Sequence, residues 1–170
     1  MQGRRRFLFS GAAAVAALTA ASRWRLGKAA PVASRDADEH FEVVRTDEQW
    51  RALLSPSQYA VLRRESTERP YSSPLNDEHR AGVFGCAGCQ RALFASRTKF
   101  DSHTGWPSFW APLDDAVATR EDRSFGVSRT EVHCGRCGGH LGHVFDDGPR
   151  PTGLRYCMNG VALSFTPAAA

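Results

Sequence analysis

The chain has 170 residues, of which 42% are hydrophobic and 24% charged, and its formal net charge of +4 gives a pI near 9.0. This length suits one compact domain, and the hydrophobic content excludes a disordered chain. The positive charge is confined to residues 1–30, which hold six basic side chains and no acidic one. The remainder has 16 basic and 18 acidic side chains, so it offers no basic cluster for a polyanion. We therefore expect no nucleic-acid partner.

Residues 1–30 have the plan of an export signal, with a charged start, an apolar stretch and small residues near the end. The sequence RRRFL at residues 4–8 fits the twin-arginine pattern, and the alternative is a buried or amphipathic N-terminal helix. We expect a periplasmic or otherwise extracytoplasmic protein, anchored if the signal stays uncleaved. No later apolar run reaches the roughly 20 residues of a spanning helix, so we expect no membrane span in the mature domain. Because twin-arginine export moves folded proteins, the signal also predicts a cofactor in the domain.

Residues 31–45 form a polar stretch without periodicity, which predicts a linker. Two helix starts follow, each with the spacing of a capping box: Thr46 with Gln49, and Ser55 with Gln58. The second also has proline at its first helical position, which favours a helix start. The domain is therefore predicted to begin with two short helices.

Beyond Gly82 the chain consists of short segments separated by Gly and Pro, which is typical of antiparallel strands. Strands are predicted at 83–86, 92–95, 116–120, 124–132, 143–145, 154–158 and 161–165. The pattern predicts a mainly β domain of the α+β class over residues 46–166, followed by a frayed tail at 167–170.

Two Cys-x-x-Cys units, Cys86 with Cys89 and Cys134 with Cys137, each contain a glycine that allows a tight turn. Two such units can hold one Zn²⁺ tetrahedrally. The alternatives are a redox dithiol or a pair of disulfides, but a redox Cys-x-x-Cys usually begins a helix. We predict one zinc ion per chain, with a structural role because four thiolates leave no open position.

The fifth cysteine, Cys157, stands in a predicted strand where Arg155, Cys157 and Asn159 alternate onto one face. A buried, inert cysteine is the alternative. An arginine and an amide beside the sulfur favour the reactive thiolate instead, because positive charge stabilises it. Cys157 is therefore a candidate nucleophile.

Two further motifs could supply the surroundings of that nucleophile. His140 and His143 can transfer protons near neutral pH, and the nearby Asp146 and Asp147 could fix their tautomers. The alternatives are a metal ligand or a surface histidine without a role. The loop GWPSFW at residues 105–110 contains two indoles, which are either core filler or the wall of an apolar pocket.

These residues together resemble the methionine-R-sulfoxide reductases of the B type. The resemblance covers about residues 47–165, and its motifs are TERPYS (67–72), CAGC (86–89), TKFDSHTGWPSFW (98–110), CGRCGGHLGHVFDDGP (134–149) and RYCMNG (155–160). It implies two antiparallel β-sheets arranged like a tent, with a structural zinc on four cysteines. It also implies thiol-dependent reduction of methionine-R-sulfoxide, in oxidised proteins or free, and hence repair of exported proteins after oxidative stress.

The resemblance implies a role for each candidate. Cys157 would attack the sulfoxide sulfur and become a sulfenic acid, and Trp106 would pack against the substrate methyl group. His140, His143 and Asn159 would hold water and deliver protons to the departing oxygen. Arg155 and Asp147 complete the predicted site and would shape its electrostatics.

Thr104 departs from the family pattern, because many members have a resolving cysteine at this position. With four of the five cysteines assigned to zinc, no second thiol is free for an intramolecular disulfide. We therefore expect an external thiol or a thioredoxin-like dithiol partner to reduce the sulfenic acid. Two other functions stay open at this point, a zinc-stabilised binding module and a redox chaperone that works through its Cys-x-x-Cys pairs.

Overall fold

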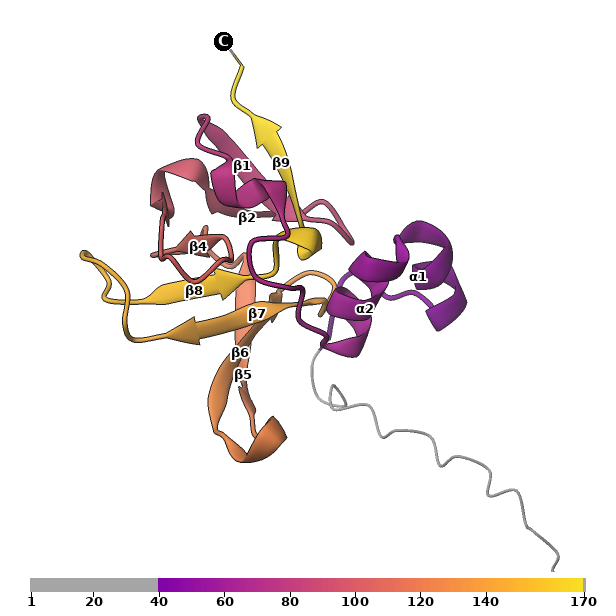
Figure 1. Ribbon diagram of the computed structural model, residues 1–170. Helices are drawn as coiled ribbons and strands as arrows, with labels where there is room; N and C mark the ends of the chain where they lie inside the picture. The colour runs from indigo at the N-terminus through magenta and orange to yellow at the C-terminus, as the bar shows by residue number, and fades with distance from the viewer. Residues whose placement is uncertain (1–39, 170) are drawn as a thin grey trace, which may run out of the picture. The chain divides into compact units, whose positions relative to one another are not determined.

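The computed structural model describes residues 40–169, which form two helices followed by two antiparallel sheets (Figure 1). The export signal and the first part of the linker, both expected from the sequence, lie outside this range. The helices are α1 (Asp47–Leu53) and α2 (Pro56–Arg64). The strands are β1 (Gly82–Cys86), β2 (Ala92–Ala95), β3 (Lys99–Phe100), β4 (Ser108–Phe109), β5 (Val117–Asp122), β6 (Arg129–Cys134), β7 (His140–Phe145), β8 (Arg155–Met158) and β9 (Leu163–Pro167).

Both capping boxes predicted from the sequence are formed. In each, the hydroxyl of the N-cap residue accepts a hydrogen bond from the backbone N–H of the glutamine three residues later, whose side chain bonds back to the N-cap backbone. Helix α2 buries Val61 and Leu62, and α1 buries Trp50. The two short helices therefore attach to the β domain through their apolar faces.

The smaller sheet has the strand order β2-β1-β9, and the larger has the order β3-β4-β8-β7-β6-β5. All pairs are antiparallel, which confirms the predicted fold class. Phenylalanines join the two sheets: Phe94 of β2 stacks on Phe109 of β4 at a centroid distance of 4.3 Å, and Phe84 of β1 meets the same ring at 5.0 Å. The core thus lies between the sheets, with strand β8 near the middle of the larger one.

Several strands differ from their predicted limits. The segment predicted as one strand over 124–132 begins with a 3₁₀ turn, η3 (Ser124–Gly126), because the Asp122 carboxylate accepts the Ser124 N–H and Gly126 has a positive φ of 73°. Likewise, 3₁₀ turn η4 (Gly160–Ala162) precedes β9, so that strand starts later than expected. Strands β3 and β4 were not predicted, since two residues carry no periodicity.

The described part of the chain packs from Phe41 onward, ahead of the expected domain start at Thr46. The Phe41 ring lies at 5.9 Å from the His133 ring and covers Gly138, where a Cβ atom would meet it at 2.5 Å. The Val43 N–H also donates to the Arg136 carbonyl at 3.0 Å. The end of the expected linker therefore covers the turn of the second Cys-x-x-Cys unit.

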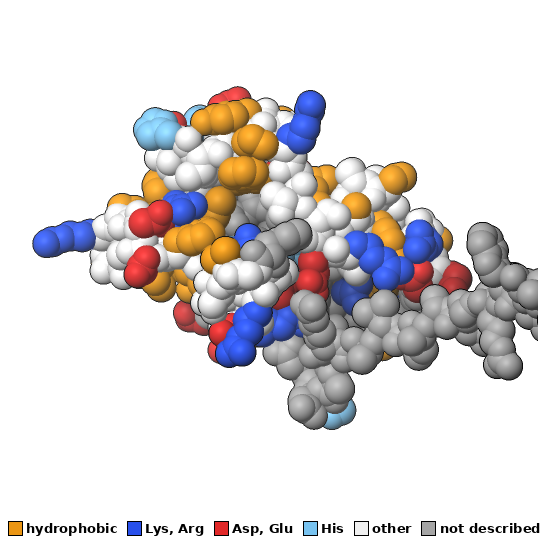
Figure 2. Space-filling model, turned by 60° about the horizontal axis from the view of Figure 1, so that its bottom comes forward, with side chains coloured by type: hydrophobic (Ala, Val, Ile, Leu, Met, Phe, Trp, Pro, Cys, Tyr) orange, Lys and Arg blue, Asp and Glu red, His pale blue; other side chains and the backbone are white. Residues whose placement is uncertain are grey.

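Charged side chains of both signs appear on the face shown in Figure 2, where several Lys and Arg groups have Asp or Glu beside them. Ion pairs on the surface include Arg51 with Asp47 and Arg80 with Glu78. Within residues 40–169, no helix has the length and hydropathy needed to cross a membrane.

Candidate active site and metal centre

The four cysteines of the two Cys-x-x-Cys units come together at the ends of two hairpins. Cys86 and Cys134 are the last residues of β1 and β6, and Cys89 and Cys137 stand in the turns that follow. All four sulfur atoms lie within 4.8 Å of one another, and none is in a disulfide. They form a cluster that can bind a metal ion.

The spacing of the sulfur atoms fits a tetrahedral metal site. The distance is 3.8 Å between the Cys86 and Cys137 sulfur atoms and 3.5 Å between those of Cys89 and Cys134. Metal–sulfur bonds of about 2.3 Å in a tetrahedron separate sulfur atoms by about 3.8 Å. The guanidinium of Arg63 also donates to the Cys137 carbonyl at 3.0 Å, which places a cation beside the turn of the second Cys-x-x-Cys unit.

Cys157 has different surroundings, in the middle of β8. Its neighbours across the strands are Ser108 of β4 and His143 of β7. The side chain is half-buried and lines a cavity of about 140 Å³ together with Trp106, His143 and Asn159. The structure thus brings together four of the residues singled out from the sequence.

The backbone around Cys157 is closely packed on the β7 side. A Cβ atom at Gly142 would stand only 2.1 Å from the Cys157 carbonyl oxygen. Only glycine fits there, so β7 can approach β8 closely enough for His143 to stand opposite Cys157.

Each of the two histidines has a carboxylate partner. His140 Nδ1 is 2.7 Å from the Glu131 carboxylate, and His143 Nε2 is 2.8 Å from the Asp122 carboxylate. The two imidazole rings are 5.5 Å apart. A carboxylate at this distance fixes the tautomer and orientation of an imidazole, which prepares its other nitrogen for proton transfer.

Each carboxylate is in turn held by an arginine. Arg120 contacts Glu131 through two nitrogens, and Arg129 donates to Asp122 at 2.7 Å. Burial opposes ionisation of Glu131, but the hydrogen bonds from His140 and Arg120 outweigh it and lower the pKa of this carboxyl to about 2. Burial likewise opposes ionisation of Asp122, whose pKa is nevertheless lowered by its hydrogen bonds. Both carboxylates are therefore charged at neutral pH.

For His143, burial has a larger effect on the pKa than the hydrogen bond does. Burial lowers the pKa of its imidazole, and this effect exceeds the opposing hydrogen bond to Asp122. The ring is therefore neutral at neutral pH, with one nitrogen bonded to Asp122.

The carboxylates that contact the histidines differ from those expected. Asp146 and Asp147 stand close to them in the sequence, but Asp147 makes a bidentate ion pair with Arg155, at 2.8 and 2.7 Å. The hydrogen bond from Arg155 lowers the pKa of the Asp147 carboxyl. Glu131 and Asp122 were missed because the pairing of β5, β6 and β7 brings them to the histidines from 9 and 21 residues away. A glutamate inside the strand predicted at 124–132 was the one available signal.

Arg155 lies on the same strand as Cys157, two residues earlier. Its guanidinium packs over the Phe145 ring at 4.4 Å and is held in place by Asp147. Cys157 contributes to raising the pKa of Arg155, after the larger effect of Asp147. The arrangement fixes a positive charge near the Cys157 sulfur.

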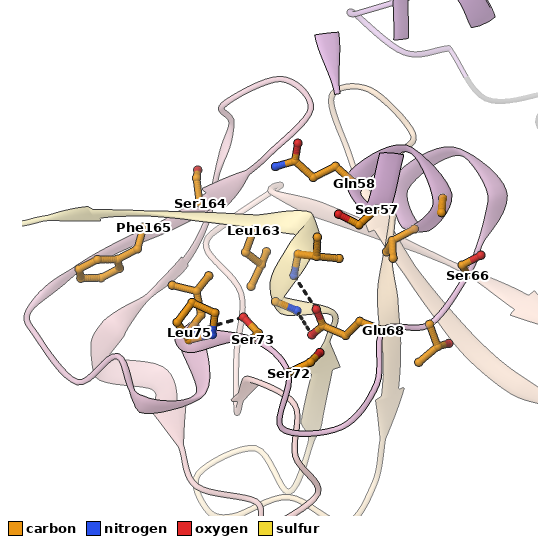
Figure 3. Close-up of a pocket in the computed structure, with 16 residues that line it drawn as sticks. Ser57, Gln58, Ser66, Glu68, Ser72, Ser73, Leu75, Leu163, Ser164 and Phe165 are labelled. Carbon is orange, nitrogen blue, oxygen red and sulfur yellow. Dashed lines mark hydrogen bonds between the residues drawn. The ribbon is translucent and has the colours of Figure 1, made fainter. Parts of the chain in front are cut away.

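Glu68 was not singled out from the sequence, yet it holds two of the cavity residues. Its carbonyl accepts the indole N–H of Trp106 at 3.1 Å, and its N–H donates to the side-chain oxygen of Asn159 at 2.9 Å. Its carboxylate accepts the backbone N–H groups of Gly160 and Val161 (Figure 3). Glu68 thus anchors the segment that orients Trp106 and Asn159.

Three hydroxyl groups cover the other side of Cys157. Thr104 Oγ1 is 3.8 Å from the Cys157 sulfur and 2.8 Å from the hydroxyl of Ser102, which in turn is 2.7 Å from that of Ser108. The four remaining cysteines of the sequence all belong to the metal cluster. The residue nearest to the sulfur on this side is therefore an alcohol and not a thiol.

Comparison with known proteins gives a single result. The family model described as "SelR domain" matches residues 54–167. The chain is 56% identical over 127 residues to the peptide methionine sulfoxide reductase MsrB of Bradyrhizobium diazoefficiens, an alignment that covers 74% of this chain and 91% of the relative. Proteins of the same name from Pseudomonas putida and Methanosarcina mazei are 54% and 51% identical, and the alignments cover 74% of this chain and 96% and 90% of those relatives.

Proposed function

The chain belongs to the SelR family of B-type methionine-R-sulfoxide reductases, oxidoreductases that reduce methionine sulfoxide, and we propose that it does so through a sulfenic acid on Cys157. The observation that carries the proposal is the cavity in which Cys157 faces Trp106, His143 and Asn159. Membership in this family also argues against a binding module without catalysis.

In the proposed reaction, the Cys157 thiolate attacks the sulfoxide sulfur while the sulfoxide oxygen is protonated. The attack forms an S–S bond, and the protonated oxygen leaves as water when the S–O bond breaks. A water molecule then attacks the Cys157 sulfur and the S–S bond breaks, which yields methionine and the sulfenic acid. Methionine gains two electrons and Cys157 loses two. Proton delivery is required because an unprotonated oxygen is a poor leaving group.

The residues around the cavity divide these tasks. The Trp106 indole offers an apolar wall for the substrate methyl group, and Glu68 fixes its orientation through the indole N–H. His140 and His143, oriented by Glu131 and Asp122, together with Asn159 hold the water and protons at the departing oxygen. Arg155, held by Asp147, supplies the positive charge that favours the attacking thiolate.

The assignment of Cys157 is tested with Cys157→Ser. We expect reduction of methionine-R-sulfoxide to fall to the detection limit, because an alcohol is a far weaker nucleophile than a thiolate. Metal content and melting temperature should stay unchanged, since Cys157 lies outside the cluster. Both sulfoxide epimers are assayed, with Ala52→Ser, on the exposed surface of α1, as the control variant. Retained activity in Cys157→Ser would exclude the proposal.

Recycling of the sulfenic acid needs an external reductant in this proposal. One thiol condenses with the sulfenic acid and releases water, and a second thiol attacks the mixed disulfide and frees Cys157. A small thiol or a thioredoxin-like dithiol protein can supply both. Mass spectrometry after one turnover without reductant should show a sulfenic acid on Cys157, whereas a disulfide between Cys157 and another cysteine of this chain would contradict the proposal.

We further propose that the metal in the four-cysteine cluster is Zn²⁺ with a structural role. The tetrahedral sulfur spacing and the all-thiolate ligands favour zinc, and a complete ligand set leaves no position for substrate. Elemental analysis of the purified protein should give one zinc per chain. A redox-active iron in its place would contradict this assignment.

The location of the protein is likewise a proposal, which rests on the RRRFL sequence at residues 4–8. We propose that a twin-arginine signal exports the folded, metal-loaded enzyme, which then repairs oxidised exported proteins. Replacing Arg4 and Arg5 with lysine should retain the protein in the cytoplasm, as measured by fractionation. Unchanged export of the double variant would exclude a twin-arginine signal.

A further inference from the structure

A second cavity is separate from the Cys157 cavity. It has a volume of about 610 Å³, within the range of natural ligand sites, and it lies between α2, the segment at residues 66–75, and the η4–β9 region (Figure 3). We call it the edge groove. Its volume is several times the 140 Å³ beside Cys157. A methionine sulfoxide side chain needs only the smaller space, so the groove is available for something else.

One wall of the edge groove is the free edge of a β-sheet. Strand β9 pairs with β1 on one side, and it is the last strand in the order β2-β1-β9. Three consecutive residues, Leu163, Ser164 and Phe165, line the groove. Side chains alternate between the two faces of a strand, so a wall that includes consecutive residues is formed by the strand's edge.

The register shows which backbone groups point from this edge. The Ala162 carbonyl and the Ala168 N–H both bond to β1 or its extensions, so residues 162, 164, 166 and 168 turn their backbone groups toward β1. Leu163 and Phe165 then direct their carbonyls, and Phe165 its N–H, toward the groove. Pro167 has no N–H and ends the edge. A short extended segment can pair with β9 over this stretch, as peptides do at free sheet edges.

The rest of the lining suits a polypeptide. The lining contains serine hydroxyls from α2 and the 66–75 segment, among them Ser57, Ser66 and Ser72, and apolar side chains such as Val61 and Leu75. Hydroxyls can bond to peptide amides, and the apolar groups can receive side chains. The one carboxylate in this lining, that of Glu68, already accepts two backbone N–H groups and does not require a cationic ligand.

The edge groove also adjoins the catalytic cavity. Thr67 lines both cavities, and Gly160, which lines the groove, directly follows Asn159, which lines the cavity beside Cys157. Glu68 joins these two segments through its hydrogen bond to Asn159. A chain that leaves the catalytic cavity past Thr67 therefore enters the groove.

We propose that the edge groove binds the extended polypeptide that flanks the oxidised methionine of a protein substrate, as an added strand on β9. The methionine sulfoxide side chain then occupies the cavity beside Cys157. This inference rests on the proposed function and adds a binding site for the chain on either side of the oxidised methionine, which free methionine sulfoxide lacks. Backbone pairing with β9 makes the enzyme favour peptides with little dependence on their sequence.

The substrate side of the proposal is tested with three compounds: free methionine-R-sulfoxide, a seven-residue peptide that carries it at the centre, and the same peptide N-methylated at single flanking amides. We expect the KM of the peptide to be roughly tenfold lower than that of the free compound. N-methylation at one flanking amide should raise the KM of the peptide by roughly two- to tenfold, because it removes one hydrogen bond to β9. Equal KM values for all three compounds would overturn the proposal.

The protein side is tested with Ala60→Trp, which places a large ring in the groove from the half-buried face of α2. The matched control is Ala52→Trp, on the exposed surface of α1 and outside the groove lining. Ala60→Trp should raise the KM for the peptide by roughly tenfold and leave turnover of free methionine-R-sulfoxide unchanged, while Ala52→Trp changes neither.

If Ala60→Trp does not fold, Ser57→Trp, at an exposed position of the same lining, replaces it. An unchanged KM for the peptide in the folded groove variant would overturn the inference and leave the proposed function intact. No turnover of either substrate by the unmodified enzyme would instead overturn the proposed function.

Discussion

The five cysteines of this chain lie in two regions that differ in backbone position and in the groups around the sulfur atom. Four are at hairpin ends, within 4.8 Å of one another, with turn backbone and arginines around them. Cys157 is in the middle of a strand and faces a cavity lined by an indole, an imidazole and an amide. The Thr104 hydroxyl is 3.8 Å from its sulfur.

With the roles proposed above, the position of a cysteine in its strand or turn sets its chemistry. Turns after β1 and β6 bring two sulfur atoms each to one point, where they can share a metal charge and lose their reactivity. The middle of β8 places one sulfur apart from the others, at the wall of a cavity. The metal cluster should therefore carry stability, and the Cys157 region should carry activity.

The largest expected effect comes from Cys134→Ser, which tests whether the metal cluster carries the stability of the fold. Losing one thiolate should release the metal and lower the free energy of unfolding by more than about 5 kcal/mol, because metal binding is coupled to folding. Elemental analysis and chemical denaturation measure both quantities. Cys157→Ser is the matched control and should lose only activity; a stable, metal-loaded Cys134→Ser would contradict the assigned roles.

A second prediction concerns Glu131, which supports His140 from the strand that ends in Cys134. Its folded pKa of about 2 lies below the ordinary value of 4.5, so its contribution to stability is fully present above about pH 4.5 and is lost as pH falls toward 2. Glu131→Gln should be less stable than the parent by about 3 kcal/mol at neutral pH.

The difference in melting temperature between the parent and Glu131→Gln should close as the pH falls toward 2. Metal loss in acid affects both proteins and cancels in this difference. The exposed Asp114→Asn is the control and should follow the parent. A difference that is constant with pH would show that the Glu131 charge does not stabilise the fold.

A third prediction concerns activity and is made for Glu68, which contacts neither the Cys157 sulfur nor the metal cluster. Glu68→Gln keeps one oxygen for Gly160 or Val161 but loses the second acceptor, so Trp106 and Asn159 should lose their fixed positions. We expect kcat/KM to fall roughly tenfold, with unchanged metal content.

A double-mutant cycle separates this effect from a general loss of stability. In a Trp106→Phe background the indole N–H that bonds to Glu68 is absent, so Glu68→Gln should then have a smaller effect on KM. Additive effects of the two substitutions would show that Glu68 acts by another route.

The smallest change in activity is expected from Thr104→Cys. This variant tests whether Cys157 stays a sulfenic acid because no second thiol is close to it. The Thr104 oxygen is 3.8 Å from the Cys157 sulfur, so a thiol there can reach it with a small rotation. The first turnover should change little, but the product should be a disulfide between the introduced thiol and Cys157, which a dithiol reductant reduces. Mass spectrometry identifies this disulfide, and a persistent sulfenic acid would contradict the expected proximity.

The sequence predicted the parts of the molecule that depend on local spacing. Both capping boxes, the metal cluster and the mainly β class follow from patterns a few residues long. The partners of His140 and His143 could not be predicted, because register across β5, β6 and β7 decides which carboxylate stands beside each ring. The role of Glu68 was hidden for the same reason, since its partners lie 38 to 93 residues away.

The metal cluster has one more consequence, for the connectivity of the chain. Cys89 and Cys134 are 45 residues apart, so a metal ion that binds both closes the segment between them into a ring. A single protease cut at the η3 turn would open this ring, yet metal–sulfur bonds would still join the two pieces. A chelator that removes the metal would leave only strand pairing and side-chain packing to hold them together, so the nicked protein should dissociate far more readily than the intact chain unfolds.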